Sequence, residues 1–309
     1  MKRYRDFNTY LKEIFGERVQ KISLDAGLGC PNRDGAISRR GCIFCDHRGS
    51  GTGALINHGL SITRQIAEAK GFIRRRYKAR KFIAYFQSFT NTYAPVSHLK
   101  GLYDEALAQK DMLGLSVATR PDCVDREILT LLSSYQTDHL VWLEYGLQSS
   151  HDKTLKLINR GHDVACFERS VLMADESSIN ICAHIILGLT GEDRKMMLQT
   201  ARFLSNLPIR GVKIHLLYVV KGTPLSELYQ KEGFRCLDRE EYANLVVDFL
   251  ELLPPDMVIQ RLTGDPFKSE LVAPLWAKEK QTNLTLIQTT LERRKTWQGR
   301  DYRKSTAVK

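Results

Sequence analysis

Residues 29–45, GCPNRDGAISRRGCIFC, hold the pattern that decides the fold of this 309-residue chain. Three of the seven cysteines fall here, at Cys30, Cys42 and Cys45, with the spacing C-x11-C-x2-C. A C-x2-C pair can chelate one metal centre, and the glycines of the stretch let the backbone wrap closely around a bulky ligand. An apolar segment typical of a β-strand, residues 19–25, comes just before, so the cysteines are expected in the loop that follows a strand.

Two kinds of metal centre suit three cysteines. Three thiolates on a cubane iron–sulfur cluster leave one iron without a protein ligand, which is what radical S-adenosylmethionine (SAM) chemistry requires. The amino and carboxylate groups of SAM chelate that iron, an electron from the cluster cleaves the C–S bond, and the 5′-deoxyadenosyl radical abstracts hydrogen from a substrate. The alternative is structural zinc with His47 as fourth ligand, although Cys45-x-His47 is a short spacing for one tetrahedral site.

Beyond this loop, apolar strand-like segments alternate with helical segments as far as residue 255. Strands are expected at residues 19–25, 82–86, 114–118, 139–145, 180–187 and 212–219. The alternation predicts an α/β fold with a parallel sheet, and six strands predict a partial (β/α)6 TIM-like barrel rather than a closed eight-stranded one. The reactive groups of such barrels lie in the loops that follow the strands.

The chain divides into three expected parts: a lead-in at residues 1–19, a core at 20–255 and a basic C-terminal appendage at 256–309. The net charge of +11 and the pI near 9.3 favour a polyanionic partner, with simple solubility as the alternative. Since no apolar run approaches the roughly 18 residues of a membrane span, and the first residues are too polar for a secretory signal, we expect a cytoplasmic protein with no membrane partner. Seven cysteines are then not expected to form a disulfide framework.

Five further segments lie at the expected strand ends or just beyond them. They are residues 85–93 (YFQSFTNTY), 119–122 (TRPD), 144–149 (EYGLQS), 159–162 (NRGH) and 187–192 (LGLTGE). With the cysteine loop, they make residues 15–255 resemble the radical SAM superfamily, especially the branch that includes the catalytic subunit of Elongator. The familiar C-x3-C-x2-C spacing is absent, and the wider first gap is similar to that branch. The resemblance implies a radical SAM barrel with one [4Fe-4S] cluster on Cys30, Cys42 and Cys45 and with SAM as second cofactor.

The match is closer to the MnmL (YtqA)-type subfamily, which residues 271–278 and 294–300 also resemble. That resemblance implies a tRNA wobble-uridine modification, the conversion of 5-carboxymethylaminomethyl-(2-thio)uridine to the 5-aminomethyl form. It implies three partners: the anticodon region of tRNA, an electron donor such as flavodoxin or ferredoxin, and a functionally coupled tRNA methyltransferase. Two alternatives stay open, a radical SAM enzyme for a small metabolite or a protein, and a non-catalytic, zinc-stabilised RNA-binding protein.

The resemblance also implies SAM contacts at the strand ends. The candidates are Gln87, Ser88, Glu144, Gln148, Gly188 and Tyr218. The first two would face the amino group of SAM, the next two its ribose or sulfonium, and the last two its adenine. Structural alternatives exist: Glu144 could instead pair with a barrel arginine such as Arg120, the glycine could belong to an ordinary turn, and the tyrosine could pack in the core.

Two groups of basic residues interleaved with aromatic ones suit phosphate contacts and base stacking. The expected RNA contacts are Arg74, Arg75, Arg76 and Lys78 in the first group, and Arg293, Arg294, Lys295, Trp297 and Arg300 in the second. A solvated charged face is the alternative for each group. Cys123, just after the third strand, is a weak candidate for a radical relay or hydrogen donor, as are His162 and His184. The other three cysteines lack a chelating spacing and are expected in the core.

Overall fold

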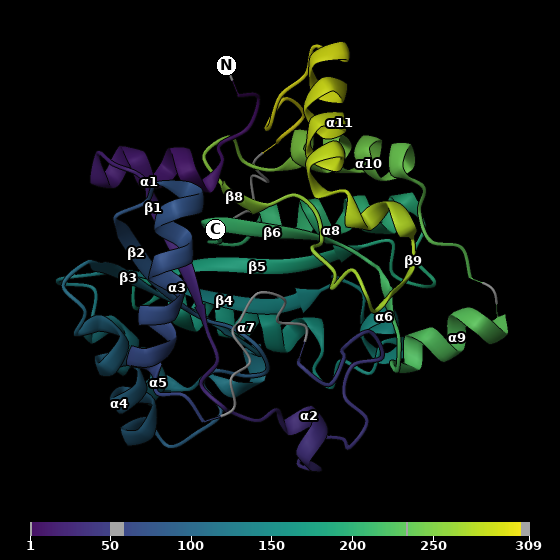
Figure 1. Cartoon of the computed structure of the whole chain (residues 1–309). Coiled ribbons are helices and arrows are strands. Elements are labelled where there is room, and N and C mark those ends of the chain that lie inside the picture. The colour runs from purple at the N-terminus through teal and green to yellow at the C-terminus, as the bar shows by residue number, and fades with distance from the viewer. Residues whose placement is uncertain (1, 50–58, 233, 304–309) are drawn as a thin grey trace.

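The computed structural model describes residues 2–49, 59–232 and 234–303, and over these ranges seven strands form one parallel sheet (Figure 1). In spatial order the strands are β1 (Val19–Leu24), β2 (Lys81–Phe86), β3 (Met112–Thr119), β4 (Leu140–Gln148), β5 (Asn180–Leu187), β6 (Gly211–Leu216) and β8 (Val258–Arg261). Spatial order follows chain order, as in a barrel that does not close. The predicted partial barrel and its six strands are therefore confirmed, and β8 is a seventh strand that the sequence analysis did not predict.

Helices connect and cover the strands. Their bounds are α1 (Phe7–Phe15), α2 (Pro31–Asp34), α3 (Ile62–Tyr77), α4 (Val96–Leu107), α5 (Arg126–Ser134), α6 (Asp152–Leu157), α7 (Val164–Asp175), α8 (Arg194–Ser205), α9 (Pro224–Glu232), α10 (Arg239–Leu252) and α11 (Lys280–Arg293). Two 3-10 turns (Pro121–Cys123 and Leu275–Lys278) and a two-stranded antiparallel ribbon of β7 (Val219–Val220) and β9 (Leu271–Ala273) complete the described fold. No helix within the described ranges is long and apolar enough to cross a lipid bilayer.

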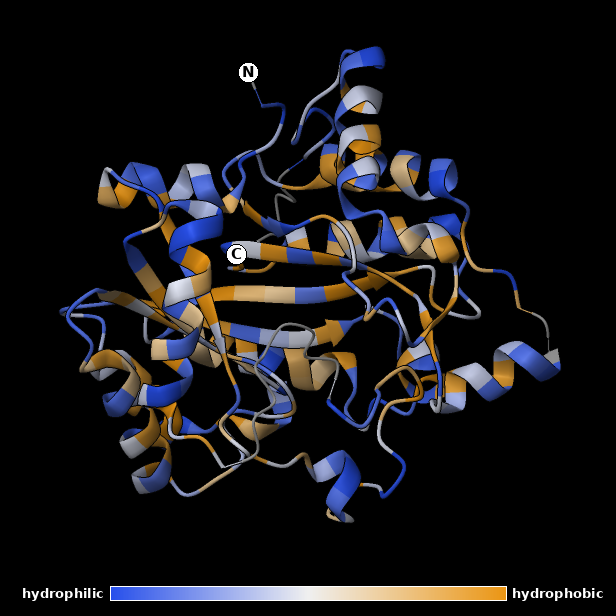
Figure 2. Ribbon diagram, in the orientation of Figure 1, coloured by the Kyte–Doolittle hydropathy of each residue, from blue (hydrophilic) through white to orange (hydrophobic). Residues whose placement is uncertain are grey.

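The strands separate an apolar outer face from a more polar inner face, because successive side chains of a strand point to opposite sides. Along β5, Ile181, Ala183 and Ile185 join the main apolar core, whereas His184 between them lines a cavity on the inner face. The same alternation along β6 sends Lys213 inward. Figure 2 shows apolar stretches along the strands and a mixture of apolar and polar residues along the outer helices. The fold therefore brings polar side chains into the barrel interior.

Helix α1 fills the end of the barrel at which the strands begin. Its Phe7 and Tyr10 pack edge-on against Trp142 of β4, with ring centroids 5.9 and 5.7 Å apart. A β-bridge from Asp6 to Ile259 ties the start of α1 to β8. With this end filled, the polar cavity lies at the opposite end, where the strands end.

The segment expected as an appendage packs closely on the sheet. It contains β8, which extends the sheet beside β6, and α11, which lies against α10 (Figure 1). The chain after α11 returns to the start of β8, where Gln298 Nε2 donates to the carbonyl oxygens of Pro254 (2.6 Å) and Met257 (2.8 Å). The expected domain boundary at residue 255 stays a prediction, and residues 304–309 of the appendage lie outside the described ranges.

Replacing Trp142 with alanine would remove the ring on which α1 packs. Because Trp142 is fully buried, we expect urea denaturation to show a free energy of unfolding lower by about 3–5 kcal/mol. The matched control is Trp297→Ala, which should change it by no more than about 0.5 kcal/mol, since Trp297 is 52% exposed. If Trp142→Ala lowers the free energy of unfolding no more than Trp297→Ala does, packing on Trp142 does not stabilise the fold.

Candidate active site

A cavity opens at the end of the sheet where the strands end, as expected for a reactive site. Its lining contains eight of the predicted residues: Cys30, Cys42, Cys45, Gln87, Ser88, Glu144, Gln148 and Tyr218. Gly188 lies outside this lining, and its backbone N–H donates to the sulfur of Met197 at 3.1 Å. The structure thus gathers the cysteine loop and most of the predicted SAM contacts around one space.

The cysteine loop is irregular apart from α2, the single helical turn whose N-cap is Cys30. Arg33 folds the loop back on itself, because its Nη2 donates to the carbonyl oxygens of Cys45 (2.8 Å) and Asp46 (2.6 Å). Gly41 adopts φ +68°, and a Cβ there would lie 2.9 Å from Arg33 Nε, so the fold-back needs glycine at this position.

Residues 158–161, which follow α6, hold the cysteine loop in place, and we call them the clamp segment. Asn159 Nδ2 donates to the carbonyl oxygen of Gly41 at 2.7 Å, and Asn32 Nδ2 donates to the carbonyl oxygen of Asn159 at 2.6 Å. Asn159 adopts φ +52°, a conformation that asparagine tolerates better than most residues. The NRGH motif of the sequence is therefore a structural partner of the cysteine loop.

Two buried N–H donors point at the sulfur of Cys42. Asn32 Nδ2 and Arg160 Nη1 each lie 3.6 Å from Cys42 Sγ. Arg160 is oriented by two further hydrogen bonds, from Nε and Nη2 to the carbonyl oxygen of Gly146 in β4. N–H groups aimed at a ligating sulfur orient cluster ligands and tune the reduction potential. The residues around Cys42 therefore fit a thiolate that ligates an iron–sulfur cluster.

The geometry does not favour the zinc alternative. Because zinc bonds sulfur at about 2.3 Å, the ligand atoms of a tetrahedral site lie about 4 Å apart. Across the described ranges, one group of three ligand atoms lies mutually within 4.8 Å, that of Glu144, Cys182 and His184; the three loop cysteines and His47 do not form such a group. A cubane binds each thiolate to a different iron, so its sulfur ligands stand farther apart.

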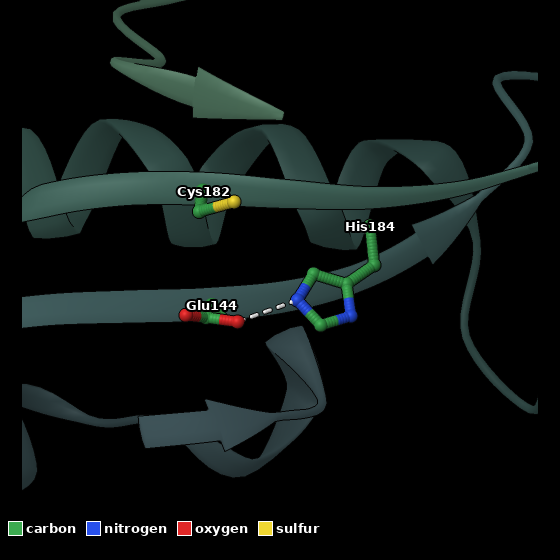
Figure 3. A group of neighbouring side chains, drawn as sticks. All are labelled: Glu144, Cys182 and His184. Atoms are coloured by element: carbon green, nitrogen blue, oxygen red, sulfur yellow. Dashed lines mark hydrogen bonds and ion pairs between the residues drawn. The ribbon is translucent and has the colours of Figure 1, made fainter. Parts of the chain in front are cut away.

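Within the group of Glu144, Cys182 and His184, a hydrogen bond joins Glu144 to His184, and Cys182 lies beside them without an ion pair (Figure 3). His184 Nε2 lies 2.7 Å from the Glu144 carboxylate, which also pairs with the ammonium groups of Lys21 and Lys213. Burial raises the pKa of Glu144, but Lys21 and Lys213 outweigh burial and lower this pKa well below its ordinary value. Burial also raises the pKa of the Cys182 thiol, and a protonated thiol is a poor metal ligand.

The structural alternative for Glu144, a pair with Arg120, does not occur in the structure. Arg120 pairs with Asp122 through Nε and Nη2, at 2.9 and 2.8 Å, and its Nη1 donates to the carbonyl oxygen of Arg160 at 2.8 Å. Glu144 instead pairs with two lysines across the barrel. Since its carboxylate is already engaged, a contact between Glu144 and the ribose of SAM stays a prediction.

The residues after β2 have an uncommon backbone. Ser88 and Phe89 adopt φ +77° and +54°, in the left-handed region that non-glycine residues enter at a cost. The Ser88 Oγ is buried and has no hydrogen-bond partner among the described residues. Because such strain gathers at functional sites, and because Ser88 is one of the residues that line the cavity, Ser88 is suited to contact a ligand there.

Cys123 and His162 lie at the margin of the site. Cys123 lines a neighbouring hollow with Asp122, and burial raises its thiol pKa to about 12. Burial, followed by the charge of Arg160, lowers the pKa of His162 to about 3, so its imidazole is neutral. A relay role for Cys123 stays a prediction. Of the other cysteines, Cys182 is buried as expected, whereas the remaining two are half-buried.

Both predicted RNA-binding groups lie at the opposite end of the sheet from the cavity. Arg74 pairs with Asp111, the residue just before β3, and Lys78 ends α3 just before β2 begins. The second group follows α11 and packs near the start of β8. Within it, Arg294 forms ion pairs with Asp248 and Glu251 of α10, at 2.7 and 3.2 Å. Nucleotides bound at either group would not reach the cavity, so both groups stay predictions for more distant parts of an RNA.

Several cavity residues escaped the sequence analysis. Lys213 and His215 of β6 and Arg261 of β8 line the cavity. Asn32 and Arg160 stood within quoted motifs, but their contacts with Cys42 were not predicted. The polar residues between apolar ones in VKIHL, residues 212–216, were a usable signal for β6. Arg261 had no such signal because β8 itself was not predicted.

Gly161 tests the clamp segment. Its φ is +80°, and a Cβ would lie 2.9 Å from Ile37 Cγ2 and 3.0 Å from Asn32 Oδ1. Gly161→Ala should displace the cysteine loop, so in metal-free protein iodoacetamide should alkylate Cys42 roughly tenfold faster, as strain of about 1–2 kcal/mol implies. The control is Gly101→Ala in α4, where a Cβ has no neighbour within 4 Å. An unchanged rate in Gly161→Ala would contradict the clamp.

Comparisons with known proteins agree with this geometry. The model of the radical SAM superfamily matches residues 28–204, and that of the radical SAM C-terminal domain matches residues 209–293. The chain is 41% identical to YtqA of Bacillus subtilis over 98% of its own length and 94% of that protein, and 30% identical to human Elongator complex protein 3 over 50% and 28%. Its fold matches Elp3 of Methanocaldococcus infernus with a TM-score of 0.69 at 16% identity, over 91% of this chain and 64% of that one. The chain therefore belongs to the radical SAM superfamily, close to YtqA and to the branch of Elongator complex protein 3.

Proposed function

We propose that this chain is a radical SAM enzyme that converts 5-carboxymethylaminomethyl-(2-thio)uridine at the wobble position of tRNA to the 5-aminomethyl form. The observation that carries the radical SAM part is the single cavity that all three cysteines of the C-x11-C-x2-C loop line. The tRNA part rests on the resemblance of the sequence to the MnmL (YtqA)-type subfamily. The proposed cofactors are one [4Fe-4S] cluster on Cys30, Cys42 and Cys45, and SAM.

Cluster and SAM together supply one-electron chemistry that removes a hydrogen atom from a bound substrate. The protein's own residues prepare the place for it. Asn32 and Arg160 orient the Cys42 thiolate, and the Ser88 hydroxyl is available to SAM. At the other end of the barrel, Phe7 and Tyr10 of α1 pack on Trp142 of β4.

A tRNA must approach from the end where the cavity opens, and exposed basic residues are present there. Arg39 and Arg40 lie on the cysteine loop, Lys153 and Lys156 on α6, and Lys221 just after β7, all on the side where the strands end. These residues are better placed for the nucleotides next to the wobble base than the two groups expected from the sequence. We infer that they contact the anticodon loop phosphates, because phosphate neutralisation dominates RNA affinity.

The proposal has further parts. A flavodoxin or ferredoxin would supply the electron, a tRNA methyltransferase would act on the product, and a reducing cytoplasm would keep the seven free cysteines reduced. The competing proposal is a small metabolite or a protein as substrate. The nucleosides in tRNA from a strain that lacks the gene distinguish the two proposals.

Deletion of the gene should leave the carboxymethylaminomethyl nucleoside unconverted in bulk tRNA. Nucleoside digestion and mass spectrometry should show the substrate nucleoside accumulating and the aminomethyl nucleoside and its methylated derivative missing. A plasmid copy should restore the product, Cys42→Ala should not, and Cys236→Ala should, since Cys236 lies outside the cavity lining. An unchanged nucleoside profile in the deletion strain would refute the tRNA proposal while leaving the radical SAM assignment intact.

Charge reversal at the cavity mouth should weaken RNA binding. For Arg39→Glu with Arg40→Glu, we expect a roughly tenfold higher Kd for an anticodon stem-loop by fluorescence anisotropy, and a slope of log K against log salt shallower by about 1–2. Arg293→Glu with Lys295→Glu makes the same charge change at the other end and should weaken binding less. Arg294 is left intact because its ion pairs stabilise the fold. If Arg293→Glu with Lys295→Glu raises the Kd more than Arg39→Glu with Arg40→Glu, the RNA binds at the end of the sheet away from the cavity, and this proposal is wrong.

A further inference from the structure

The interior of the barrel below the cavity mouth has a basic floor, made of Lys21, Lys213, His215 and Arg261. Lys213 and Arg261 are register neighbours on β6 and β8, and His215 lies two residues farther along β6. Lys213, His215 and Arg261 all line the cavity. These four residues lie on β1, β6 and β8, outside the cysteine loop that follows β1.

The floor carries more positive than negative charge. Glu144 is the carboxylate that pairs with Lys21 and Lys213, and one carboxylate cannot neutralise both. In the ranges that the structure describes, no carboxylate lies within ion-pair distance of the Arg261 guanidinium, although this side chain is only partly exposed. Burying unpaired charge is costly, so a site of this kind favours an anionic ligand.

The neutral imidazole of His215 completes the floor beside Lys213. The His215 Nε2 is shielded from solvent and has no hydrogen-bond partner among the described residues. Its ring stands 5.4 Å from that of His184, and burial, followed by the charge of Arg261, lowers the pKa of His215 well below its ordinary value. Burial lowers the pKa of Lys213 to about 7, so an anion beside this lysine would also favour its charged form.

We propose that Arg261 and His215, supported by Lys213, form a carboxylate-binding subsite in the floor of the cavity. Its ligand, which rests on the function proposed above, is the carboxylate of the carboxymethyl group on the wobble uridine. A guanidinium fork beside a neutral imidazole matches the two oxygens of a carboxylate. Because the methylene carbon is bonded to this carboxylate, the subsite would hold inside the cavity both the methylene hydrogens and the carbon–nitrogen bond that must break to leave the aminomethyl form.

The same floor gives selectivity for substrate over product. The aminomethyl product has lost the carboxylate and keeps an ammonium group, which the charges of Lys213 and Arg261 repel. A site that attracts one form and repels the other discriminates more strongly than a site that only attracts. The floor therefore assists release of the product as well as binding of the substrate.

A carboxylate in the floor could also come from SAM, so the test has two arms, both with cluster-loaded enzyme and no reductant. In the first, [1-13C]acetate is titrated with SAM present, and its 13C line width is measured. Saturable broadening that is weakened roughly tenfold or more by Arg261→Gln supports the subsite. The control is Arg202→Gln on the outer face of α8, where the arginine is exposed. Absence of saturable broadening, or broadening seen only without SAM, overturns the subsite as one for a substrate.

In the second arm, Kd values are compared for anticodon stem-loops with the carboxymethylaminomethyl or the aminomethyl uridine. Wild type should prefer the carboxylate-bearing RNA roughly tenfold to hundredfold, and Arg261→Gln should lose this preference while binding the aminomethyl RNA no more weakly. Equal affinities in wild type overturn the proposed ligand. If acetate binds but neither RNA does, the subsite stands and the proposed tRNA function fails. Cluster absorbance and thermal unfolding confirm that each variant is folded.

Discussion

The site depends on polar contacts that hold an irregular loop against a regular sheet. The cysteine loop has one helical turn of its own, so the backbone hydrogen bonds that it lacks internally must come from elsewhere. The clamp segment supplies them through Asn159, and Asn32 returns a hydrogen bond to it. Arg160 joins this link to the sheet, because one guanidinium reaches both Cys42 and the carbonyl of Gly146. The cysteine loop is thereby positioned by β4, the central strand.

Strand alternation supplies the second constraint. Inward side chains of a barrel must fill its interior, and here many of them are charged or polar. Glu144 anchors that interior by pairing with Lys21 from β1 and Lys213 from β6, which links distant strands of the sheet. Because α1 packs at the end of the barrel where the strands begin, the polar cavity opens at the end where the strands end. Chemistry is therefore confined to the end where the strands end.

Much of the fold could be predicted from the sequence because apolar periodicity and the cysteine spacing are local signals. The location of the two basic groups could not be predicted, because a crossover helix runs antiparallel to its strands and carries Arg74 to the end away from the cavity. The ion pairs of Arg294 with α10 could not be predicted either, because they are tertiary contacts. β8 is short, and its pairing with β6 rather than any pattern of its own makes it a strand, so Arg261 was hidden. Arg160 was found as a motif residue, but its contact with Cys42 spans 118 positions.

We propose that Cys30, Cys42 and Cys45 together hold one iron–sulfur cluster in this cavity. The most direct measurement is iron and acid-labile sulfide in anaerobically purified protein, with zinc measured in parallel, for wild type, the three cysteine-to-alanine variants and Cys166→Ala as control. About four iron and four sulfide per chain in wild type and Cys166→Ala, and their loss in the three variants, is the predicted result. Stoichiometric zinc without sulfide, even after reconstitution with iron and sulfide, would contradict the account.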